Sequence, residues 1–349
     1  MKTKIIRIDD SYKDIEKKLS PAADAIKRGG LVVFPTETVY GLGGDATSST
    51  SAEKIYEAKN RPSDNPLIIH ISEPSDAETY TYTTDLYYKL SEKFMPGPLT
   101  VILKARENIP SKTRGGLETV AVRCPSHPVA RALISMAGVP IAAPSANLSG
   151  SPSPTSPAHV IDDMNGRVDF IIDGGDSDFG LESTIVKIND DGSLTLLRPG
   201  AVTLDMLREV CGRVEVAAAV TEKLSEGERV LSPGMKYRHY APASPVILLD
   251  GDDEAASRYI IENGDEGVAV LSYTEQVSYY SERLPRADIY DFGSEHDEGA
   301  QAHRLFSILR DADKKNYRVI YAPLPKKEGI GLALYNRMIR AAAYTVKKL

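Results

Sequence analysis

The sequence predicts an α/β protein built from two domains. A chain of 349 residues is too long for one hydrophobic core of ordinary size. Short apolar runs suited to strands alternate with helix-like stretches, and polar loops gather where the strand candidates end. A stretch of low apolar content interrupts this alternation. We therefore expect a first domain over residues 1–212, a linker over 213–245 and a smaller second domain over 246–349.

The composition is that of an ordinary globular protein. Hydrophobic residues make up 42% and charged residues 26% of the chain, both in the usual range. No apolar run approaches the ~20 residues that a membrane-spanning helix needs, and the N-terminus lacks the apolar segment of a secretory signal. Cys124 and Cys211 are the only cysteines, which excludes a disulfide framework and a cysteine-rich zinc site. We expect a cytoplasmic protein.

The charge is unevenly distributed along the chain. The formal net charge is −7, yet residues 251–300 alone hold thirteen acidic and three basic residues. The rest of the chain is therefore close to neutral or slightly basic. This distribution argues against extensive nucleic-acid binding but leaves room for a cationic cleft in the first domain.

The first domain should alternate strands and helices. Gly30 is a typical helix C-cap, and Thr50 or Ser51 is a suitable N-cap. The expected helices cover 21–30, 51–58, 80–93 and 127–136. The expected strands cover 31–34, 67–71, 99–104, 119–123, 139–143, 168–173, 183–188 and 194–198. This pattern is typical of an α/β domain with a ligand crevice along one edge of its sheet.

The segment KNRPSDNPLIIH, which begins at Lys59, is the first candidate site. Its two prolines forbid a helix or a central strand between them, so Lys59, Arg61 and Asn65 lie on a stiff connector. Two fixed cations beside an amide suit the binding of a polyphosphate. Taken alone, the segment also fits an ordinary solvated loop between a helix and a strand.

Glycines follow the first strand in the segment PTETVYGLGGDA. They would let backbone N–H groups approach a ligand closely, although a plain glycine turn remains an alternative. The segment is neither a Walker A loop nor a dinucleotide-binding GxGxxG motif. Polar residues also stand at the ends of later strands, among them Arg123, Ser145, Ser183 and Arg198.

The linker contains the segment SPGMKYRHYAP over 232–242. Its tyrosines, histidine and basic residues suit a strap that folds over a pocket, or a plain surface linker. Beyond it, we expect strands at 246–250, 267–272, 288–292 and 318–322, and helices at 253–263, 297–315 and 331–347. This spacing predicts a small parallel sheet with right-handed crossovers. Because this domain lacks a phosphate-binding glycine pattern, we expect it to support or regulate the first.

Eight motifs together resemble one family. They are PTETVYGLG, KNRPSDNPLIIH, PGPLT, TVAVRCP, APSANLSG, ESTIV, LRPG and SPGMKYRHYAP. In this order they look like the YrdC-type threonylcarbamoyl-AMP synthases, in the long form with a C-terminal domain. The resemblance runs from about Gly30 to Pro242 and continues more loosely beyond. It implies a YrdC-like twisted mixed sheet with helices, followed by a Rossmann-like parallel α/β domain.

The resemblance implies a nucleotidyltransferase that uses L-threonine, bicarbonate or CO2, and ATP with Mg²⁺. The products would be threonylcarbamoyl-AMP and pyrophosphate. A tRNA threonylcarbamoyltransferase complex would then modify adenosine 37 of tRNAs that read ANN codons. The resemblance identifies no magnesium ligand.

The resemblance also implies a set of site residues, with Lys59 and Arg61 as the catalytic pair. The expected ATP contacts are Lys59, Arg61, Asn65, Thr119, Ser145, Ser153, Arg198, Tyr237, His239 and Tyr240. The expected L-threonine contacts are Thr36, His70, Arg123, Ala143 and Ser183. Arg123 suits the threonine carboxylate because a guanidinium can bind a carboxylate through two hydrogen bonds. Without the resemblance, His70 would be interpreted as a core histidine.

Three other interpretations remain open. The fold also suits a module that binds tRNA or double-stranded RNA weakly, but the basic residues here stand singly among hydroxyls and glycines. A hydrogenase-maturation carbamoyltransferase would need zinc-finger cysteines that two cysteines cannot supply. A purely structural protein would leave the polar strand ends unexplained. We expect a monomer.

Overall fold

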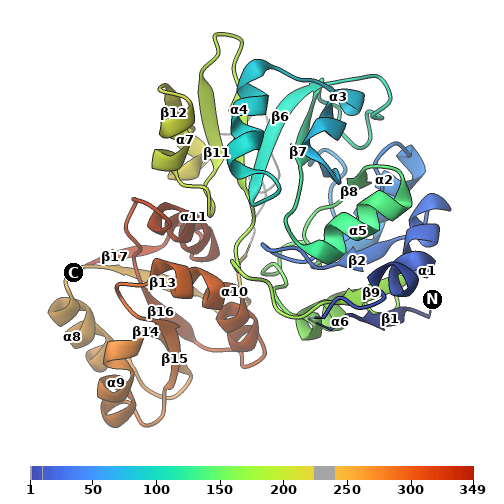
Figure 1. The fold of residues 1–349 in the computed structure, drawn as a ribbon. Coiled ribbons are helices and arrows are strands. Elements are labelled where there is room, and N and C mark those ends of the chain that lie inside the picture. The colour runs from blue at the N-terminus through green and yellow to red at the C-terminus, as the bar shows by residue number, and fades with distance from the viewer. Residues whose placement is uncertain (1, 10, 224–239) are drawn as a thin grey trace. The chain divides into compact units, whose positions relative to one another are not determined.

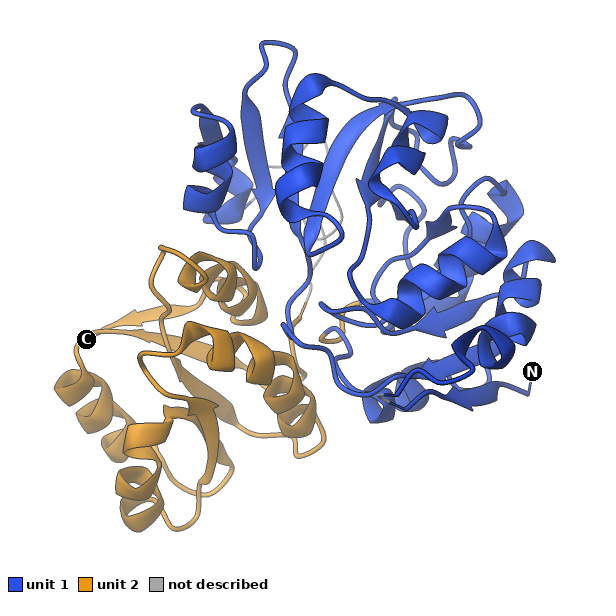
Figure 2. Ribbon diagram, in the orientation of Figure 1, with its two compact units in different colours: residues 1–149, 153–236 blue, residues 150–152, 237–349 orange. Residues whose placement is uncertain are grey.

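The computed structural model describes residues 2–9, 11–223 and 240–349 (Figure 1). The chain forms two compact units (Figure 2). The first comprises Met1–Ser149 and Ser153–Lys236, and the second comprises Gly150–Pro152 and Tyr237–Leu349. Each unit is organised around a β-sheet of its own.

The described part of the first unit contains a twelve-stranded mixed sheet. The strand order is β1-β9-β2-β3-β8-β4-β7-β6-β10-β11-β12, and β5 pairs with β6. The strands are β1 (Lys4–Arg7), β2 (Val32–Phe34), β3 (Gly41–Asp45), β4 (Ile68–His70), β5 (Thr81–Tyr82), β6 (Leu99–Ala105), β7 (Thr119–Arg123), β8 (Ile141–Ala142), β9 (Phe170–Asp173), β10 (Thr184–Ile188), β11 (Leu194–Arg198) and β12 (Val214–Val216). Parallel pairs such as β4 and β7 alternate with antiparallel ones such as β6 and β7.

Most helices of the first unit begin at a side chain that caps a free N–H group, although α1 and α3 do not. The helices are α1 (Ile15–Lys27), α2 (Ser49–Lys59), α3 (Ala77–Tyr80), α4 (Asp85–Phe94), α5 (Pro128–Ala137), α6 (Pro157–Met164) and α7 (Leu204–Val210), with 3₁₀ turns η1 (Pro74–Asp76) and η2 (Ala218–Val220). Ser48 caps α2, and Thr84 caps α4. The caps place the starts of both helices a few residues from the positions predicted from sequence.

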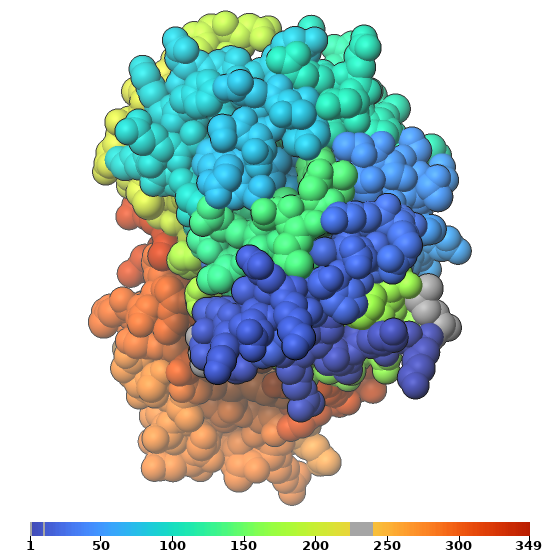
Figure 3. All heavy atoms as spheres, turned by 45° about the vertical axis from the view of Figure 1, so that its right-hand side comes forward, coloured from blue at the N-terminus to red at the C-terminus, as the bar shows by residue number. Residues whose placement is uncertain are grey.

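The core of the first unit lies between the sheet and the pair α1 and α5. Leu19 and Ile26 of α1 and Leu133 of α5 are fully buried, together with Phe34 of β2. Figure 3 shows the dark blue surface of the N-terminal segment and α1 next to the green surface of α5. Burying such side chains stabilises the fold by about 1.5–3 kcal/mol each.

The second unit has a five-stranded, all-parallel sheet in the order β15-β14-β16-β13-β17. Its strands are β13 (Val246–Asp250), β14 (Val268–Tyr273), β15 (Asp288–Gly293), β16 (Val319–Pro323) and β17 (Val346–Lys348). Its helices are α8 (Asp253–Asn263), α9 (Val277–Arg283), α10 (Glu298–Asp313) and α11 (Gly331–Ala341), with a 3₁₀ turn η3 (Thr274–Gln276). The predicted fold class, a mixed twisted sheet followed by a parallel α/β domain, is confirmed.

Several predicted elements are wrong in detail. The helix expected over 21–30 spans Ile15–Lys27, and the helix expected over 80–93 begins only at Asp85, after strand β5. The expected glycine loop after β2 is strand β3, which pairs with β2 and β8. A Cβ at Gly43 would come within 2.6 Å of the Ile141 side chain, so close strand packing explains the glycine. The last predicted helix ends early at Ala341, because Ala343 and Tyr344 adopt positive φ angles and lead into β17.

None of the helices in the described ranges is long and apolar enough to cross a membrane.

Candidate functional site

Four adjacent strands, β8, β4, β7 and β6, organise the candidate site. The parallel register of β4 and β7 aligns His70 with Arg123. The antiparallel register of β6 and β7 sets Thr100 opposite Arg123. Residues opposite one another on neighbouring strands project from the same face of a sheet. A histidine, an arginine and a threonine therefore form one row across three strands.

Arg123 is the charged centre of this row. Its guanidinium is buried, and Nη2 lies 2.7 Å from Oε1 of Glu37 and 3.4 Å from Oγ1 of Thr36. Glu37 also accepts a hydrogen bond from the backbone N–H of Ser126. Nε of Arg123 is buried and has no hydrogen-bond partner in the described structure. Buried donors are almost always paired, so this N–H is available to a ligand.

His70 is an uncharged member of the row. Its burial, and next the adjacent Arg123, lower its pKa from 6.5 to about 3. Nδ1 lies 3.2 Å from the carbonyl oxygen of Ile68, and the ring meets Phe34 edge to face. His70 is therefore a neutral imidazole at physiological pH.

Hydroxyl groups and a second arginine extend the row toward β10 and β11. Oγ of Ser183 lies 2.8 Å from Oγ1 of Thr100. Arg198 donates from Nη2 to Oγ of Ser183 (3.1 Å) and from Nε to the Ser183 carbonyl oxygen (3.0 Å). The neighbouring Glu182 accepts a hydrogen bond from Oγ of Ser153 at 2.5 Å. Arg198 and Ser153, predicted to bind ATP, thus lie around Ser183, which was predicted to bind threonine.

Thr36 and Ala143 complete the predicted threonine set. The Thr36 hydroxyl is buried, donates to the Val39 carbonyl oxygen and accepts from the backbone N–H of Thr38. Oγ1 of Thr36 also accepts a hydrogen bond from Nη2 of Arg123. Ala143 is buried, and its backbone N–H bonds to the carbonyl oxygen of Ile68. Thr36, His70, Arg123 and Ser183 therefore gather around the carboxyl ends of β4 and β7. Ala143 instead lies level with Ile68, at the amino end of β4.

Lys59 forms part of a second cluster. It is the last residue of α2 and is almost completely buried. Its Nζ donates hydrogen bonds to the carbonyl oxygens of Ser145 and Asn147. Oγ of Ser145 bonds in turn to Oδ1 of Asn147. These contacts fix the ammonium as a buried positive charge beside the segment that follows β8.

The connector between α2 and β4 carries the other members of this cluster. Arg61 is half-buried, and its Nη2 lies 3.4 Å from the Asn65 carbonyl oxygen and 3.3 Å from that of Pro66. Oδ1 of the buried Asn65 has no hydrogen-bond partner in the described residues. Thr119 stands two positions before Ala121, the partner of Ile68. Thr119 therefore lies at the amino end of β4, on the side of this connector.

The Lys59 cluster and the row of His70 and Arg123 thus lie toward opposite ends of the short strand β4, although the predicted ATP contacts Ser153 and Arg198 lie near Ser183. Lys59, Arg61 and Asn65 precede β4, whereas His70 ends it. A strand advances about 3.3 Å per residue, so the four steps from Pro66 to His70 span roughly 13 Å. This spacing can hold the phosphates of one ligand and the carboxylate of another.

Three linker residues were predicted to contact ATP. Tyr237 and His239 lie outside the described residues. Tyr240 is buried within the second unit, where its ring stacks on Phe306 at a centroid distance of 5.2 Å. The Arg337 guanidinium lies 5.9 Å from the same ring centroid.

Sequence reasoning missed four residues that hold the site together: Glu37, Thr100, Asn147 and Glu182. Each stands within two residues of a predicted contact or directly opposite one on a neighbouring strand. A glutamate next to Thr36 could have been expected to pair with a buried arginine, since buried carboxylates need a partner. The pairing of Thr100 with Arg123 depends on strand register and has no local signal.

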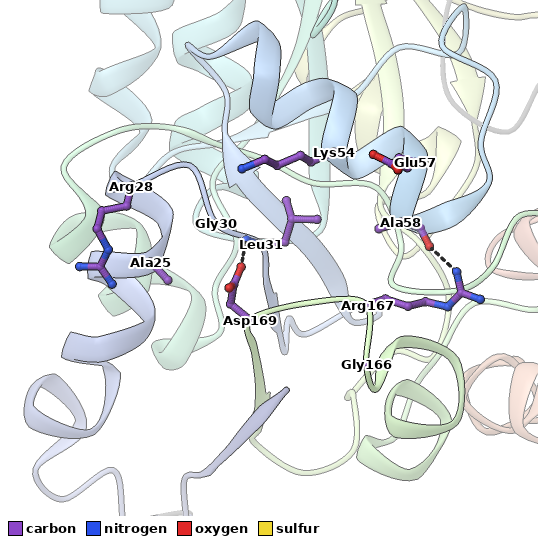
Figure 4. Close-up of a pocket in the computed structure, with 10 residues that line it drawn as sticks. All are labelled: Ala25, Arg28, Gly30, Leu31, Lys54, Glu57, Ala58, Gly166, Arg167 and Asp169. Carbon is purple, nitrogen blue, oxygen red and sulfur yellow. Dashed lines mark hydrogen bonds between the residues drawn. The ribbon is translucent and has the colours of Figure 1, made fainter. Parts of the chain in front are cut away.

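A surface cavity of about 630 Å³ lies elsewhere on the first unit. Figure 4 shows Lys54, Glu57, Arg167 and Asp169 around it. Asp169 accepts the N–H of Leu31. Of the predicted site residues that the structure describes, none lines this cavity. Across the described residues, no group of three or more His, Cys, Asp or Glu is arranged to hold a metal ion.

Two family models match the chain. One, described as "Telomere recombination", matches residues 24–200 and bears the family name Sua5-YciO-YrdC. The other, "Threonylcarbamoyl-AMP synthase, C-terminal domain", matches residues 202–343.

Curated proteins and solved structures are similar over almost the whole chain. A Bacillus subtilis threonylcarbamoyl-AMP synthase is 41% identical and covers 98% of both chains. A Pyrococcus abyssi threonylcarbamoyl-AMP synthase is 40% identical and covers 96% of both. The structure of P. abyssi Sua5 complexed with L-threonine matches with a TM-score of 0.88 and 38% identity, covering 99% of this chain and 100% of that one.

Proposed function

Since the chain belongs to the threonylcarbamoyl-AMP synthase family, a family of nucleotidyltransferase-type enzymes, we propose that it makes threonylcarbamoyl-AMP and pyrophosphate from L-threonine, bicarbonate or CO2, and ATP. The observation that carries this proposal is the pair of polar clusters at opposite ends of β4. One cluster offers a buried guanidinium N–H, and the other offers two cations and a buried amide oxygen.

Arg123 is proposed to bind the threonine carboxylate. Its buried Nε–H has no protein acceptor in the described structure, while Nη2 is already held by Glu37. The neutral imidazole of His70 lies beside Arg123 without adding charge, so the local positive charge stays on the guanidinium. The related P. abyssi Sua5 was solved with L-threonine, which supports a threonine pocket here. Thr36, Ala143 and Ser183 complete the proposed pocket.

Lys59, Arg61 and Asn65 are proposed to hold the ATP phosphates. Two cations at the end of a helix and on a proline-stiffened connector supply positive charge where phosphates need it. Oδ1 of Asn65 is a hydrogen-bond acceptor, so it would face a bound cation or a donor of the nucleotide and not a phosphate oxygen. The wider nucleotide site would include Thr119, Ser145, Ser153, Arg198, Tyr237, His239 and Tyr240. Mg²⁺ is proposed to arrive with ATP, because phosphate oxygens and water are ligands that it accepts.

The proposed reaction has two bond-forming steps. The threonine nitrogen attacks the carbon of CO2 and loses a proton, which gives a carbamate. A carbamate oxygen then attacks the α-phosphorus of ATP, the bond between the α-phosphorus and its bridging oxygen breaks, and pyrophosphate leaves with the electron pair. The protein contributes position and charge: Arg123 fixes the amino acid, and Lys59 and Arg61 neutralise the phosphates.

We further propose that the product passes to a tRNA threonylcarbamoyltransferase complex that modifies adenosine 37 of ANN-decoding tRNAs in the cytoplasm. In this proposal, residues 1–212 form the catalytic domain, 213–245 the linker and 246–349 an accessory domain. The protein acts as a monomer.

A pyrophosphate-release assay tests the proposal. Purified protein is given Mg-ATP, L-threonine and bicarbonate, and each component is omitted in turn. We expect release to require all three, and L-serine to replace L-threonine poorly. Release without threonine would reveal a different nucleotide reaction, and tight RNA binding without any release would replace the proposal by an RNA-binding function.

A further inference from the structure

The carboxyl ends of β13 and β16 in the second unit meet at a topological switch point. The chain crosses the sheet in one direction from β13 to β14 and β15, and in the opposite direction from β15 to β16 and β17. Right-handed crossovers then place α8 and α9 on one face and α10 and α11 on the other (Figure 1). Doubly wound sheets bind their ligands in the crevice at such a point.

A cavity of about 160 Å³ occupies this position. Its floor is apolar and includes Leu249 at the end of β13 and Leu271 in β14. Asp253, Gln276 and Glu295 supply polar groups around it. Asp253 and Gln276 also line a groove of about 700 Å³ between α8 and the η3–α9 segment, so the cavity and the groove share one wall.

The turn after β13 has the wrong charge for a nucleotide. In dinucleotide-binding folds the first strand-to-helix turn holds a phosphate at the helix N-terminus. Here that turn reads Gly251-Asp252-Asp253-Glu254, and Oδ1 of Asp252 accepts the N–H of Ala255. The carboxylate of Asp252 therefore already occupies the helix N-terminus. The three acidic side chains would repel a phosphate and attract a cation.

The other charged residues that line the cavity and the groove are also mainly acidic. The cavity and groove together are lined by five acidic and two basic residues. One of the two bases, Arg258, is already paired with Glu254 at 2.9 Å. Burial, and next Glu295 and Asp253, raise the pKa of the Tyr273 hydroxyl to about 12. Five of the thirteen acidic residues of 251–300 thus line a hollow with an apolar floor.

We propose that the second unit binds a small aliphatic amine in this cavity, with an ammonium group between Asp253 and Glu295 and its methylene chain over Leu249 and Leu271. A molecule with several ammonium groups joined by methylenes could continue along the acidic groove. A free amino acid also carries an ammonium group, and Lys326 at the rim would then face its carboxylate. This inference is independent of the chemistry proposed for the first unit.

Isothermal titration of the full-length protein with spermidine, putrescine, L-lysine and MgCl2 at constant ionic strength tests the proposal. We expect one saturable site for an amine and none for Mg²⁺, which lacks the methylene chain. Preference for spermidine or putrescine would identify a polyamine site, and preference for L-lysine an amino-acid site. Absence of saturable binding by every amine at millimolar concentration would overturn the proposal.

Matched charge-removing variants localise the site. Asp253→Asn and Glu295→Gln should each weaken binding about tenfold, the loss expected for a partly exposed charge-assisted contact. Asp265→Asn and Glu282→Gln remove exposed acids of the same unit that line neither hollow, so they should leave the affinity unchanged. Equal weakening by all four variants, each with an unchanged unfolding midpoint, would show a diffuse acidic surface and overturn the proposal.

Discussion

Arg123 and Glu37 form an ion pair that is almost fully withdrawn from water. Nη2 and Oε1 lie 2.7 Å apart, and the two side chains are 5% and 2% exposed. The pair holds one edge of the guanidinium while Nε remains without a protein acceptor in the described structure. Such a pair is costly to break from one side, because the remaining charge stays buried.

Glu37→Gln should therefore destabilise the protein strongly. Loss of one partner of a buried pair typically costs about 3–5 kcal/mol. Urea denaturation of the variant measures the change in the free energy of unfolding. Glu73→Gln is the matched control: it breaks the exposed Arg131–Glu73 pair and should cost less than about 1 kcal/mol. Similar losses in both variants would contradict the assigned role of the buried pair.

Arg123→Lys should impair the use of threonine. A lysine keeps the positive charge but cannot offer a planar pair of N–H groups to a carboxylate. We expect KM for L-threonine to rise at least about tenfold, which corresponds to the loss of one charge-assisted hydrogen bond. KM for ATP should change little, as measured by pyrophosphate release. A rise confined to KM for ATP would move Arg123 out of the proposed threonine pocket.

Arg61→Ala should impair the use of ATP. The variant removes a proposed charge-assisted phosphate contact worth about 1.5–3 kcal/mol. Arg61 is half-buried and bonds to backbone carbonyls of its own connector, so an ATP titration should be accompanied by a thermal unfolding scan. Unchanged ATP affinity and turnover in a folded variant would remove Arg61 from the site.

His70 should make stability depend on pH. Its pKa is about 3 in the folded protein, well below the value of 6.5 for an unperturbed histidine. Between these values the unfolded chain binds the extra proton, so stability falls as the pH decreases from about 6.5 toward 3, by at most about 1.4 kcal/mol per pH unit. His70→Gln should flatten this part of the curve in denaturation series at several pH values. An identical slope in variant and parent would refute the assignment.

Local patterns allowed much of the fold to be predicted. The runs TVAVR and LTLLR gave the exact bounds of β7 and β11, because β-branched and apolar residues stand between clear turns. Strand β3 was missed because its sequence, GLGGD, has low strand propensity, and tertiary packing around Gly43 decides its conformation. β17 was missed because left-handed residues, which leave no strong signal in AAYT, interrupt the preceding helix.

The candidate site could be predicted as a set of residues but not as an arrangement. The family resemblance identified Arg123 and His70 as expected threonine contacts. Their position side by side depends on the pairing of β4 with β7, two strands far apart in sequence. The roles of Glu37 and Thr100 follow from the same long-range pairing. Likewise, only the three-dimensional structure reveals that Oδ1 of Asn65 has no hydrogen-bond partner among the residues that it describes.

Gly150–Pro152 belong to the second unit although residues 153–236 separate them from the rest of it in the sequence. The guanidinium of the buried Arg310 donates two hydrogen bonds to the carbonyl oxygen of Pro152, at 3.0 Å and 2.7 Å. A gene segment that begins at Tyr240 would encode every strand and helix of the second unit but not this acceptor. The second unit is therefore not encoded by one continuous segment. A fusion or truncation that begins at Tyr240 would remove Pro152, whose carbonyl oxygen pairs with the buried Arg310.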